Sequence, residues 1–133
     1  GRVHFAGYHK DPRAHYRAMD LFALSSDTEQ MPIALLEAMA SGLQVVATDV
    51  GDVRAMLPSE QARFVVAPGA RAAQELALGL AELALDPQLR ERLAAGNRRQ
   101  AEQRFALERM VESYAQLYRA ALGRRGRGST FRS

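Results

Sequence analysis

The sequence predicts an α/β protein: a Rossmann-like parallel sheet with flanking helices, partial at about four strands, followed by a helical C-terminal end. Short apolar runs alternate with amphipathic segments through the first half of the chain, as expected for strands joined by crossover helices. Glycine and proline residues mark the boundaries between these segments. From Arg71 onward only helical periodicity is visible. We therefore expect a sheet in the first half and helices alone in the second.

The expected strands are short apolar runs. The run at 21–24, Leu-Phe-Ala-Leu, is continuous, which is typical of a strand covered by helices on both faces. The expected strands are residues 3–6, 21–24, 44–48 and 63–66. The expected helices between them are residues 12–19 with Asp11 as N-cap, a helix from Pro32 that stops at Gly42, and residues 53–57 closed by Pro58. Because ligands of parallel sheets lie beyond the carboxyl ends of the strands, residues that directly follow a strand are the candidates for a site.

Three amphipathic helices are expected after the sheet. Leucines at helical spacing mark the inner faces of the first two: Leu76, Leu80, Leu83, Leu89 and Leu93. Between these helices, Asp86-Pro87 is expected to cap and start the second. The third helix, from about 107 to 122, is expected to bury an apolar stripe: Met110, Val111, Tyr114, Leu117 and Tyr118. We expect one domain over residues 1–122 and a disordered basic tail at 123–133.

The composition is that of an ordinary globular protein, with 47% hydrophobic and 25% charged residues in a chain of 133. Cysteine is absent, which excludes disulfides and agrees with a reducing, cytoplasmic compartment. No apolar run approaches the ~18 residues that span a bilayer. The chain begins at Gly1 with an apparent strand directly after it, and we expect it to be cut from a larger protein.

The charge is unevenly distributed. Residues 1–89 hold seven basic and eleven acidic side chains, whereas residues 90–133 hold eleven Arg against four Glu. One interpretation is a basic surface for peripheral contact with an anionic membrane. The other is a solvated helix face with an exposed tail. We expect no nucleic-acid partner.

The candidate site centres on residues 29–42, Glu-Gln-Met-Pro-Ile-Ala-Leu-Leu-Glu-Ala-Met-Ala-Ser-Gly. Pro32 is expected to be the first residue of the helix, since its missing N–H would have no intrahelical partner there. The face expected to pack on the sheet consists of Ile33, Leu36, Met39 and Ala40. Glu29 lies in the loop before this helix, and Glu37 lies one turn along the face that carries Ile33.

Glu29 and Glu37 frame the free N–H groups of the helix start. A helical rise of ~1.5 Å per residue places their Cα atoms on the order of 10 Å apart, which is roughly the span from the ribose to the hexose of a sugar nucleotide. The amide groups and the helix dipole between them suit a phosphate. Ionised carboxylates only accept hydrogen bonds, so they suit recognition of sugar hydroxyls.

The chain resembles the C-terminal part of the nucleotide-sugar-binding domain of the retaining glycosyltransferases of family 4, which have the two-domain GT-B fold. The resemblance covers about residues 1–122. It rests on VHFAG at 3–7, DLFALSS at 20–26, the E-x7-E frame with LLEAMASG, QVVATDVG at 44–51, and the helical ending with Phe105 and Tyr114 to Tyr118.

The resemblance implies a role for each matching residue. Glu37 would hold the ribose hydroxyls of the donor, and Glu29, the residue placed at the reacting sugar, would contact hydroxyls of the transferred hexose. The remaining implied contacts are Gln30, Met31 and Pro32 at the sugar and phosphates, Ile33 and Ala34 beneath the diphosphate, and Gly7 and Tyr8 near the nucleobase. Transfer in such enzymes retains the anomeric configuration, needs no metal and uses no cofactor besides the donor.

The chain departs from the family pattern at several positions. Gln30 replaces the glycine that usually follows the first acid, and a Cβ there is expected to narrow the approach to the donor sugar. Asp52 and Ala55 stand where the family often has a second glycine and an acid. Ala106 replaces the hydroxyl N-cap usual at the start of the last helix.

The resemblance also implies two further strand–helix units and a preceding acceptor-binding domain, which we expect in the larger protein from which this chain is cut. We expect this piece alone to be inactive.

Three functions remain open from the sequence. The first is the donor half of a glycosyltransferase that uses a UDP-, GDP- or ADP-linked sugar and an unknown glycan or lipid acceptor. The second is another GT-B enzyme, such as a nucleotide-sugar epimerase. The third is a noncatalytic nucleotide-sugar-binding module, suggested by Gln30 and Ala55. His4, His9 and His15 lack the spacing of metal ligands, and we expect them to be structural or exposed.

Overall fold

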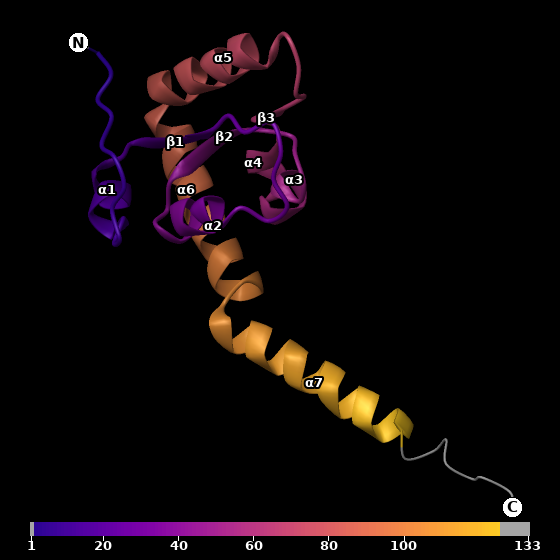
Figure 1. The fold of residues 1–133 in the computed structure, drawn as a ribbon. Helices are drawn as coiled ribbons and strands as arrows, with labels where there is room; N and C mark the ends of the chain where they lie inside the picture. Colours follow the sequence, from indigo (N-terminus) through magenta and orange to yellow (C-terminus); the bar gives the residue numbers. More distant parts are fainter. Residues whose placement is uncertain (1, 126–133) are drawn as a thin grey trace, which may run out of the picture.

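The computed structural model describes residues 2–125, with side chains described through residue 123, and shows an α/β domain from which one long helix extends (Figure 1). The described elements are α1 (Arg13–Ala18), β1 (Leu21–Leu24), α2 (Ile33–Ala40), β2 (Gln44–Thr48), α3 (Val53–Met56), α4 (Ser59–Ala62), β3 (Val65–Val66), α5 (Ala72–Leu85), α6 (Pro87–Arg104) and α7 (Leu107–Arg125). The strands form one parallel sheet in the order β1-β2-β3. The predicted fold class is therefore confirmed, with three described strands in place of about four.

The core lies on both faces of β2, which is buried along its whole length. Val45 and Ala47 pack with residues of α2, α3 and α6 on one face. Val46 packs with Phe64 and with leucines of α5 and α6 on the other. Figure 1 shows the same layering, with α5 above the sheet and α2 below it. Alternation along β2 thus divides the core into two layers, as expected for a strand covered on both sides.

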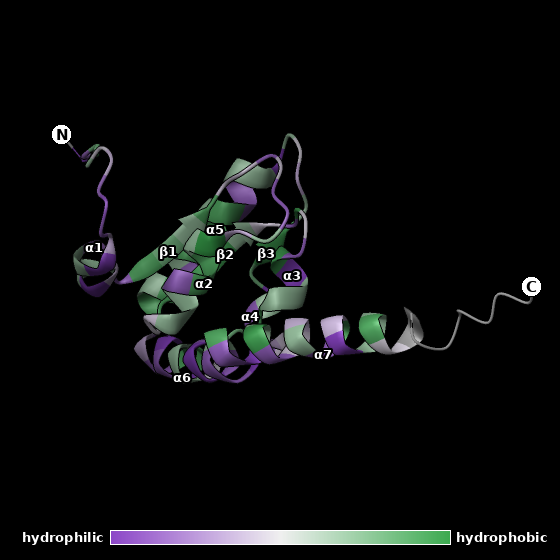
Figure 2. Cartoon of the chain, turned by 60° about the horizontal axis from the view of Figure 1, so that its bottom comes forward, coloured by the Kyte–Doolittle hydropathy of each residue, from purple (hydrophilic) through white to green (hydrophobic). Residues whose placement is uncertain are grey.

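The predicted strand at residues 3–6 is wrong, because residues 2–9 form neither helix nor strand. Val3 is 73% exposed and Phe5 is 92% exposed. A strand needs a partner for its backbone hydrogen bonds, and among the described residues no strand pairs with this segment. In both views the segment runs away from the sheet beyond α1 (Figures 1 and 2).

The other boundaries differ from prediction by small shifts. α1 begins at Arg13 with Pro12 as its N-cap, so the prediction of Asp11 as the N-cap is wrong. Asp11 lies one residue earlier, where its side chain accepts a hydrogen bond from the Arg13 backbone N–H at 3.2 Å and pairs with the Arg13 guanidinium. The expected helix at 53–57 is the shorter α3, and α4 follows Pro58 as an unpredicted helix. β3 is only two residues long, although the Phe64 carbonyl before it still accepts from Ala47 N–H at 3.2 Å.

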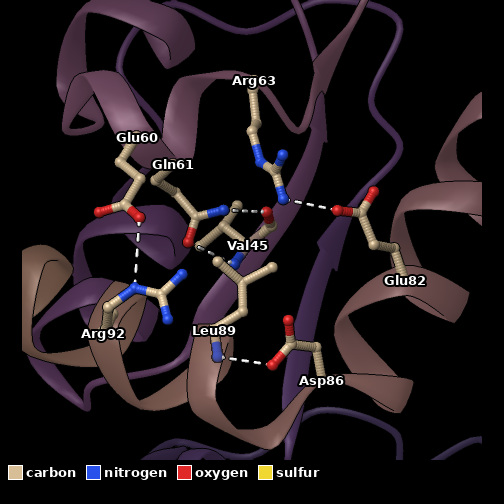
Figure 3. Close-up of polar contacts among 8 residues, drawn as sticks. All are labelled: Val45, Glu60, Gln61, Arg63, Glu82, Asp86, Leu89 and Arg92. Atoms are coloured by element: carbon tan, nitrogen blue, oxygen red, sulfur yellow. Dashed lines mark hydrogen bonds and ion pairs between the residues drawn. The ribbon is translucent and has the colours of Figure 1, made fainter.

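The side chain of Gln61 from α4 takes the place of a neighbouring strand beside Val45 (Figure 3). Its Nε2 donates to the Val45 carbonyl at 2.7 Å, and its Oε1 accepts from the Val45 N–H at 3.3 Å. Asn97 of α6 donates through Nδ2 to the same Oε1 at 2.9 Å and to the Leu43 carbonyl at 2.8 Å. Gln61 and Asn97 are both fully buried. This network extends the pairing of β2 beyond the short β3.

Gln61→Leu is expected to lower the free energy of unfolding by about 3 kcal/mol. The substitution keeps the volume but leaves the buried N–H and carbonyl of Val45 without partners, each at ~1–3 kcal/mol before relaxation, and removes one of the two hydrogen bonds of the Asn97 amide nitrogen. Chemical denaturation of the variant and the unmodified protein measures the difference. A loss below about 0.5 kcal/mol would contradict this role.

The predicted cap between α5 and α6 is confirmed. Asp86 Oδ1 accepts from Leu89 N–H at 2.9 Å, and Pro87 is the first residue of α6. Leu83, Leu89 and Leu93 are buried, as predicted. Figure 3 shows this cap beside the surface ion pairs Arg63–Glu82 and Glu60–Arg92.

Asp86→Ala is expected to lower the free energy of unfolding by ~1 kcal/mol through loss of this cap. Asp86→Asn retains an accepting oxygen, so it should recover most of that loss. Thermal melts of the two variants test the difference between them, and equal losses would indicate that the capping hydrogen bond is not the cause.

The predicted burial of the last helix is wrong, although the helix itself is confirmed. α7 runs from Leu107 to Arg125 and leaves the domain (Figure 1). Its apolar stripe is exposed at Met110, Val111, Tyr114, Leu117 and Tyr118, between 50% and 68%. Among the described elements none covers this stripe beyond the start of the helix. The predicted tail at 123–133 begins too early, because the helix continues to Arg125, and residues 126–133 lie outside the described residues.

Candidate functional site

The β1–α2 loop and the start of α2 lie at the carboxyl edge of the sheet. Pro32 was predicted to be the first residue of α2, but it is the N-cap. Its ψ of 119° is extended, and helical geometry starts one residue later, at Ile33. The first intrahelical bonds run from the amides of Leu35 and Leu36 to the Pro32 carbonyl. The amides of Ile33 and Ala34 precede these bonds, so they belong to the positively polarised helix tip.

The predicted end of α2 at Gly42 is confirmed. Gly42 has a φ of +76°. Its N–H donates to the Met39 carbonyl, and the N–H of Leu43 donates to the Ala38 carbonyl. These two bonds form a Schellman motif, in which glycine tolerates the left-handed conformation.

The face of α2 that packs on the core differs from prediction. Leu35, Ala38 and Met39 are fully buried, whereas Ile33 is 69% exposed and Ala40 is also exposed. Leu36 is half-buried against the core. The helix is therefore rotated relative to the predicted face, and Glu37, which follows Ile33 by one turn, lies on the exposed side. The exposed position leaves the Glu37 carboxylate accessible to a ligand.

Glu29 is half-buried in the β1–α2 loop. Its Oε1 accepts a hydrogen bond from Ser26 Oγ at 2.7 Å. The carbonyl of Ser26 accepts from Thr48 Oγ1 at 2.6 Å. Because Thr48 ends β2, the loop that carries Glu29 is tied directly to the neighbouring strand.

The turn after β2 holds the same loop from the other side. The N–H of Asp52 donates to the Gln30 carbonyl at 2.7 Å. Gly51 has a φ of +53°, and a Cβ added there would overlap the carbonyl oxygens of Glu29 and Gln30. A glycine is therefore required both for the turn and for the close approach of the loop.

Glu37 is linked to α1 through Tyr16. The Tyr16 hydroxyl donates to Glu37 Oε2 at 2.9 Å, and the Tyr16 side chain is buried. Burial, followed by the hydrogen bond to Glu37, raises the pKa of Tyr16 to about 12. Both residues line a groove that also includes Arg13, Arg17, Ser41 and Arg98. Glu29 does not line this groove.

The remaining predicted site residues divide into two groups. Gln30 and Met31 are exposed in the loop, Pro32 is buried beneath it and Ala34 is half-buried in the first turn of α2. Gly7 and Tyr8 lie in the segment before α1, apart from this loop in both views (Figures 1 and 2). Tyr8 is 90% exposed. The structure brings residues 29–34 and 37 onto one loop–helix unit, and it does not bring Gly7 and Tyr8 to them.

Gln30 fits the loop without backbone strain. Among the described residues, positive φ angles occur only at glycines, so Gln30 does not occupy a conformation that requires glycine. Its side chain is exposed, while its carbonyl accepts the bond from Asp52. The departure from the family pattern at this position leaves the loop intact.

Two residues that hold the site, Tyr16 and Thr48, were not predicted as site residues, and Gly51 was expected there only as part of the segment 49–52 that follows a strand. Gly51 was part of the TDVG motif, but the sequence does not show which carbonyls it approaches. The hydrogen bond of Tyr16 with Glu37 joins residues 21 apart in the chain, and that of Thr48 with Ser26 joins residues 22 apart. Contacts between such distant residues produce no local sequence pattern.

Within residues 2–125 no cluster of three or more His, Cys, Asp or Glu side chains forms a potential metal site. His9 and His15 lie with their ring centroids 4.2 Å apart, and His9 Nε2 is 2.8 Å from the Ala6 carbonyl. None of the helices described is both long enough and apolar enough to cross a membrane.

Glu29 in the β1–α2 loop and Glu37 one turn along α2 thus belong to one loop–helix unit at the carboxyl edge of a parallel sheet in an α/β domain. Residues 1–100 match the family model described as glycosyl transferases group 1. The chain therefore belongs to the glycosyl transferases group 1 family.

Curated relatives carry glycosyltransferase names. The chain is 35% identical over 107 residues to a D-inositol 3-phosphate glycosyltransferase of Saccharomonospora viridis, covering 80% of this chain and 24% of the relative. It is 31% identical over 117 residues to the lipopolysaccharide core biosynthesis glycosyltransferase LpsE of Rhizobium meliloti, covering 88% and 34%. It is 32% identical over 126 residues to the lipopolysaccharide core biosynthesis mannosyltransferase LpsB of the same organism, covering 91% and 34%. The chain thus spans about a quarter to a third of the length of these relatives.

Proposed function

We propose that this chain is the donor-binding part of a longer glycosyltransferase of family 4 with the GT-B fold. The full-length parent would transfer a hexose from a nucleoside-diphosphate sugar to an unknown glycan or lipid hydroxyl, with retention at the anomeric carbon and without a metal ion. The observation that carries this proposal is the fixed loop–helix unit, in which Glu29 and Glu37 flank the N-terminus of α2. Family membership supports the sugar transfer itself.

Each part of the unit suits one part of the donor. Glu37, exposed on α2, is assigned to the ribose hydroxyls, and Glu29, in the loop before α2, is assigned to hydroxyls of the hexose. The amides of Ile33 and Ala34 are assigned to the diphosphate, where negative charge grows as the bond to the hexose breaks. Fixed amide dipoles stabilise such charge without reorganisation during the reaction.

The support for the other proposed contacts is unequal. Gln30, Met31 and Pro32 lie in the same loop as Glu29 and are assigned to the approach to the hexose and phosphates. Gly7 and Tyr8 are assigned to the nucleobase from the family resemblance alone.

Isothermal titration calorimetry of the full-length parent tests the proposal. The ligands are UDP-, GDP- and ADP-linked hexoses, each titrated without added metal and again with EDTA. We expect one nucleotide class to bind with the same affinity in both conditions. Failure of every sugar nucleotide to bind would contradict the proposal. If a sugar nucleotide binds and analysis of the reaction products finds a free epimerised sugar, the protein is an epimerase instead.

We also propose that the parent contacts an anionic membrane surface peripherally through its basic C-terminal third. Arg109 and Arg119 lie on α7, whose apolar stripe is exposed. Cations beside an exposed apolar helix face favour an anionic lipid surface. Co-sedimentation with liposomes should increase as phosphatidylglycerol replaces phosphatidylcholine, and independence from anionic lipid content would contradict this contact.

A further inference from the structure

Tyr16 and Glu37 form a hydrogen bond between α1 and α2, which also meet where Tyr16 packs with Ala38 and where its hydroxyl lies 3.5 Å from the Ala34 carbonyl. Tyr16 comes from α1, and its hydroxyl donates to Glu37 Oε2 of α2 at 2.9 Å. The Tyr16 ring packs against Phe22 of β1, with ring centroids 6.1 Å apart. Only 8% of Tyr16 is exposed. The hydroxyl is therefore delivered to Glu37 by a side chain whose own position is fixed by packing.

The Glu37 carboxylate depends on this bond for its orientation. Glu37 is exposed on α2, and within residues 2–125 it forms no ion pair. An exposed glutamate samples several rotamers, and fixing it for a ligand costs conformational entropy. The hydrogen bond from Tyr16 selects one orientation before a ligand arrives. Such preorganisation increases affinity by reducing the entropy lost on binding.

We propose that Tyr16 is a positioning residue for donor binding, whose hydroxyl holds the Glu37 carboxylate in the orientation that accepts a vicinal diol of the donor's ribose. This inference rests on the proposed function, because it requires Glu37 to bind the ribose. Tyr16 itself need not touch the donor. Its contribution is to make the carboxylate ready for two neighbouring hydroxyls at once.

The hydrogen bond leaves room for this ligand. An ionised carboxylate offers about four acceptor positions, of which Tyr16 uses one on Oε2. The other oxygen and the second lone pair of Oε2 remain for the ribose. The groove that includes both side chains is open to solvent beside Ser41 and Arg98. Tyr16 stays protonated at neutral pH, since its pKa is raised to about 12, and it therefore remains a donor.

A double-mutant cycle in the full-length parent tests this role. Tyr16→Phe removes the hydroxyl and keeps the ring against Phe22. Glu37→Ala removes the carboxylate that Tyr16 is proposed to act through. Calorimetry measures the affinity of each single variant and of the double variant for the nucleoside diphosphate whose sugar conjugate the unmodified protein binds. The same titrations are repeated with the 2′-deoxy analogue of that diphosphate.

We expect Tyr16→Phe to weaken binding of the ribonucleotide about three- to tenfold. The same substitution should have no further effect in the Glu37→Ala background. Preference for the ribonucleotide over its 2′-deoxy analogue should decrease in Tyr16→Phe. Tyr118→Phe is a matched control, because it removes the same hydroxyl from an exposed tyrosine on α7, and its affinity should equal that of the unmodified protein.

Three results would overturn the inference. The first is unchanged affinity and unchanged ribose preference in Tyr16→Phe. The second is an equal loss of affinity in the presence and absence of Glu37, which would indicate a role independent of the carboxylate. In both cases a Glu37-dependent donor affinity of the unmodified protein would leave the proposed function standing. The third is absence of any nucleotide binding by the unmodified protein, which would overturn the proposed function as well.

Discussion

Glu37→Ala in the full-length parent is expected to weaken binding of the nucleoside diphosphate and of its sugar conjugate by the same factor, roughly 100-fold. Two hydrogen bonds from hydroxyl groups to an ionised carboxylate are together worth about 3 kcal/mol, which corresponds to this factor. The ribose is common to both ligands, so the loss does not depend on the hexose. Calorimetric titration of both ligands measures the two losses directly.

Glu29→Ala is expected to affect the two ligands differently, in contrast to Glu37→Ala. If Glu29 contacts the hexose, the variant should bind the nucleoside diphosphate as the unmodified protein does and should bind the sugar nucleotide about tenfold more weakly. Glu82→Ala is a control on the surface of α5, where Glu82 pairs with Arg63, and its affinities should be unchanged. Equal losses for both ligands in Glu29→Ala would contradict the assignment of Glu29 to the hexose.

Gly51→Ala is expected to lower the free energy of unfolding by about 4 kcal/mol and to reduce donor binding. The left-handed φ of +53° disfavours alanine by ~1–2 kcal/mol. Overlap with the carbonyl oxygens of Glu29 and Gln30 adds a further ~1–3 kcal/mol. Relief of this overlap requires the β1–α2 loop to move, and that movement displaces Glu29. Chemical denaturation and donor titration measure the two effects.

Gly42→Ala separates the cost of a left-handed backbone conformation from the cost of steric overlap between Cβ and a neighbouring carbonyl. Gly42 also has a left-handed φ, of +76°, but a Cβ there meets no atom within 4 Å. We therefore expect a loss of only ~1 kcal/mol in stability and no change in donor affinity. If Gly51→Ala were no more damaging than Gly42→Ala, the close approach of the turn to the loop would not be essential.

The sequence predicted most reliably the elements whose signals are local. Asp86-Pro87 was placed correctly because a cap followed by proline is specific to a helix start. Gly42 was placed correctly because the Schellman motif favours glycine. The run at 21–24 was assigned correctly as a strand, but its expected cover on both faces is incomplete, because Ala23 is exposed and the other three residues are only half-buried at the edge of the sheet.

The wrong predictions concern which other element, if any, a segment packs against or pairs with. The stripe on α7 was correctly located on one helix face, but periodicity gives a face and does not reveal whether another element covers it. The apolar run at 3–6 carries the composition of a strand, yet strand formation requires a neighbour to pair with. The buried face of α2 was shifted because alanine and leucine occur on several sides of that helix.

In the candidate site too, local features were predicted and contacts between distant residues were not. The resemblance placed Glu29 and Glu37 on one loop–helix unit, and the structure has them there. The contacts that fix this unit, from Tyr16, Thr48 and Gly51, join residues far apart in the chain. Such contacts depend on the packing of α1 and on the register of β2, which no short sequence pattern specifies.

A crystal structure of the full-length parent with its sugar nucleotide tests the central claim most directly. The account predicts the two ribose hydroxyls on the Glu37 carboxylate, the diphosphate at the amides of Ile33 and Ala34, and the hexose beside Glu29. A donor bound away from the β1–α2 loop, with no contact to Glu37, would contradict it.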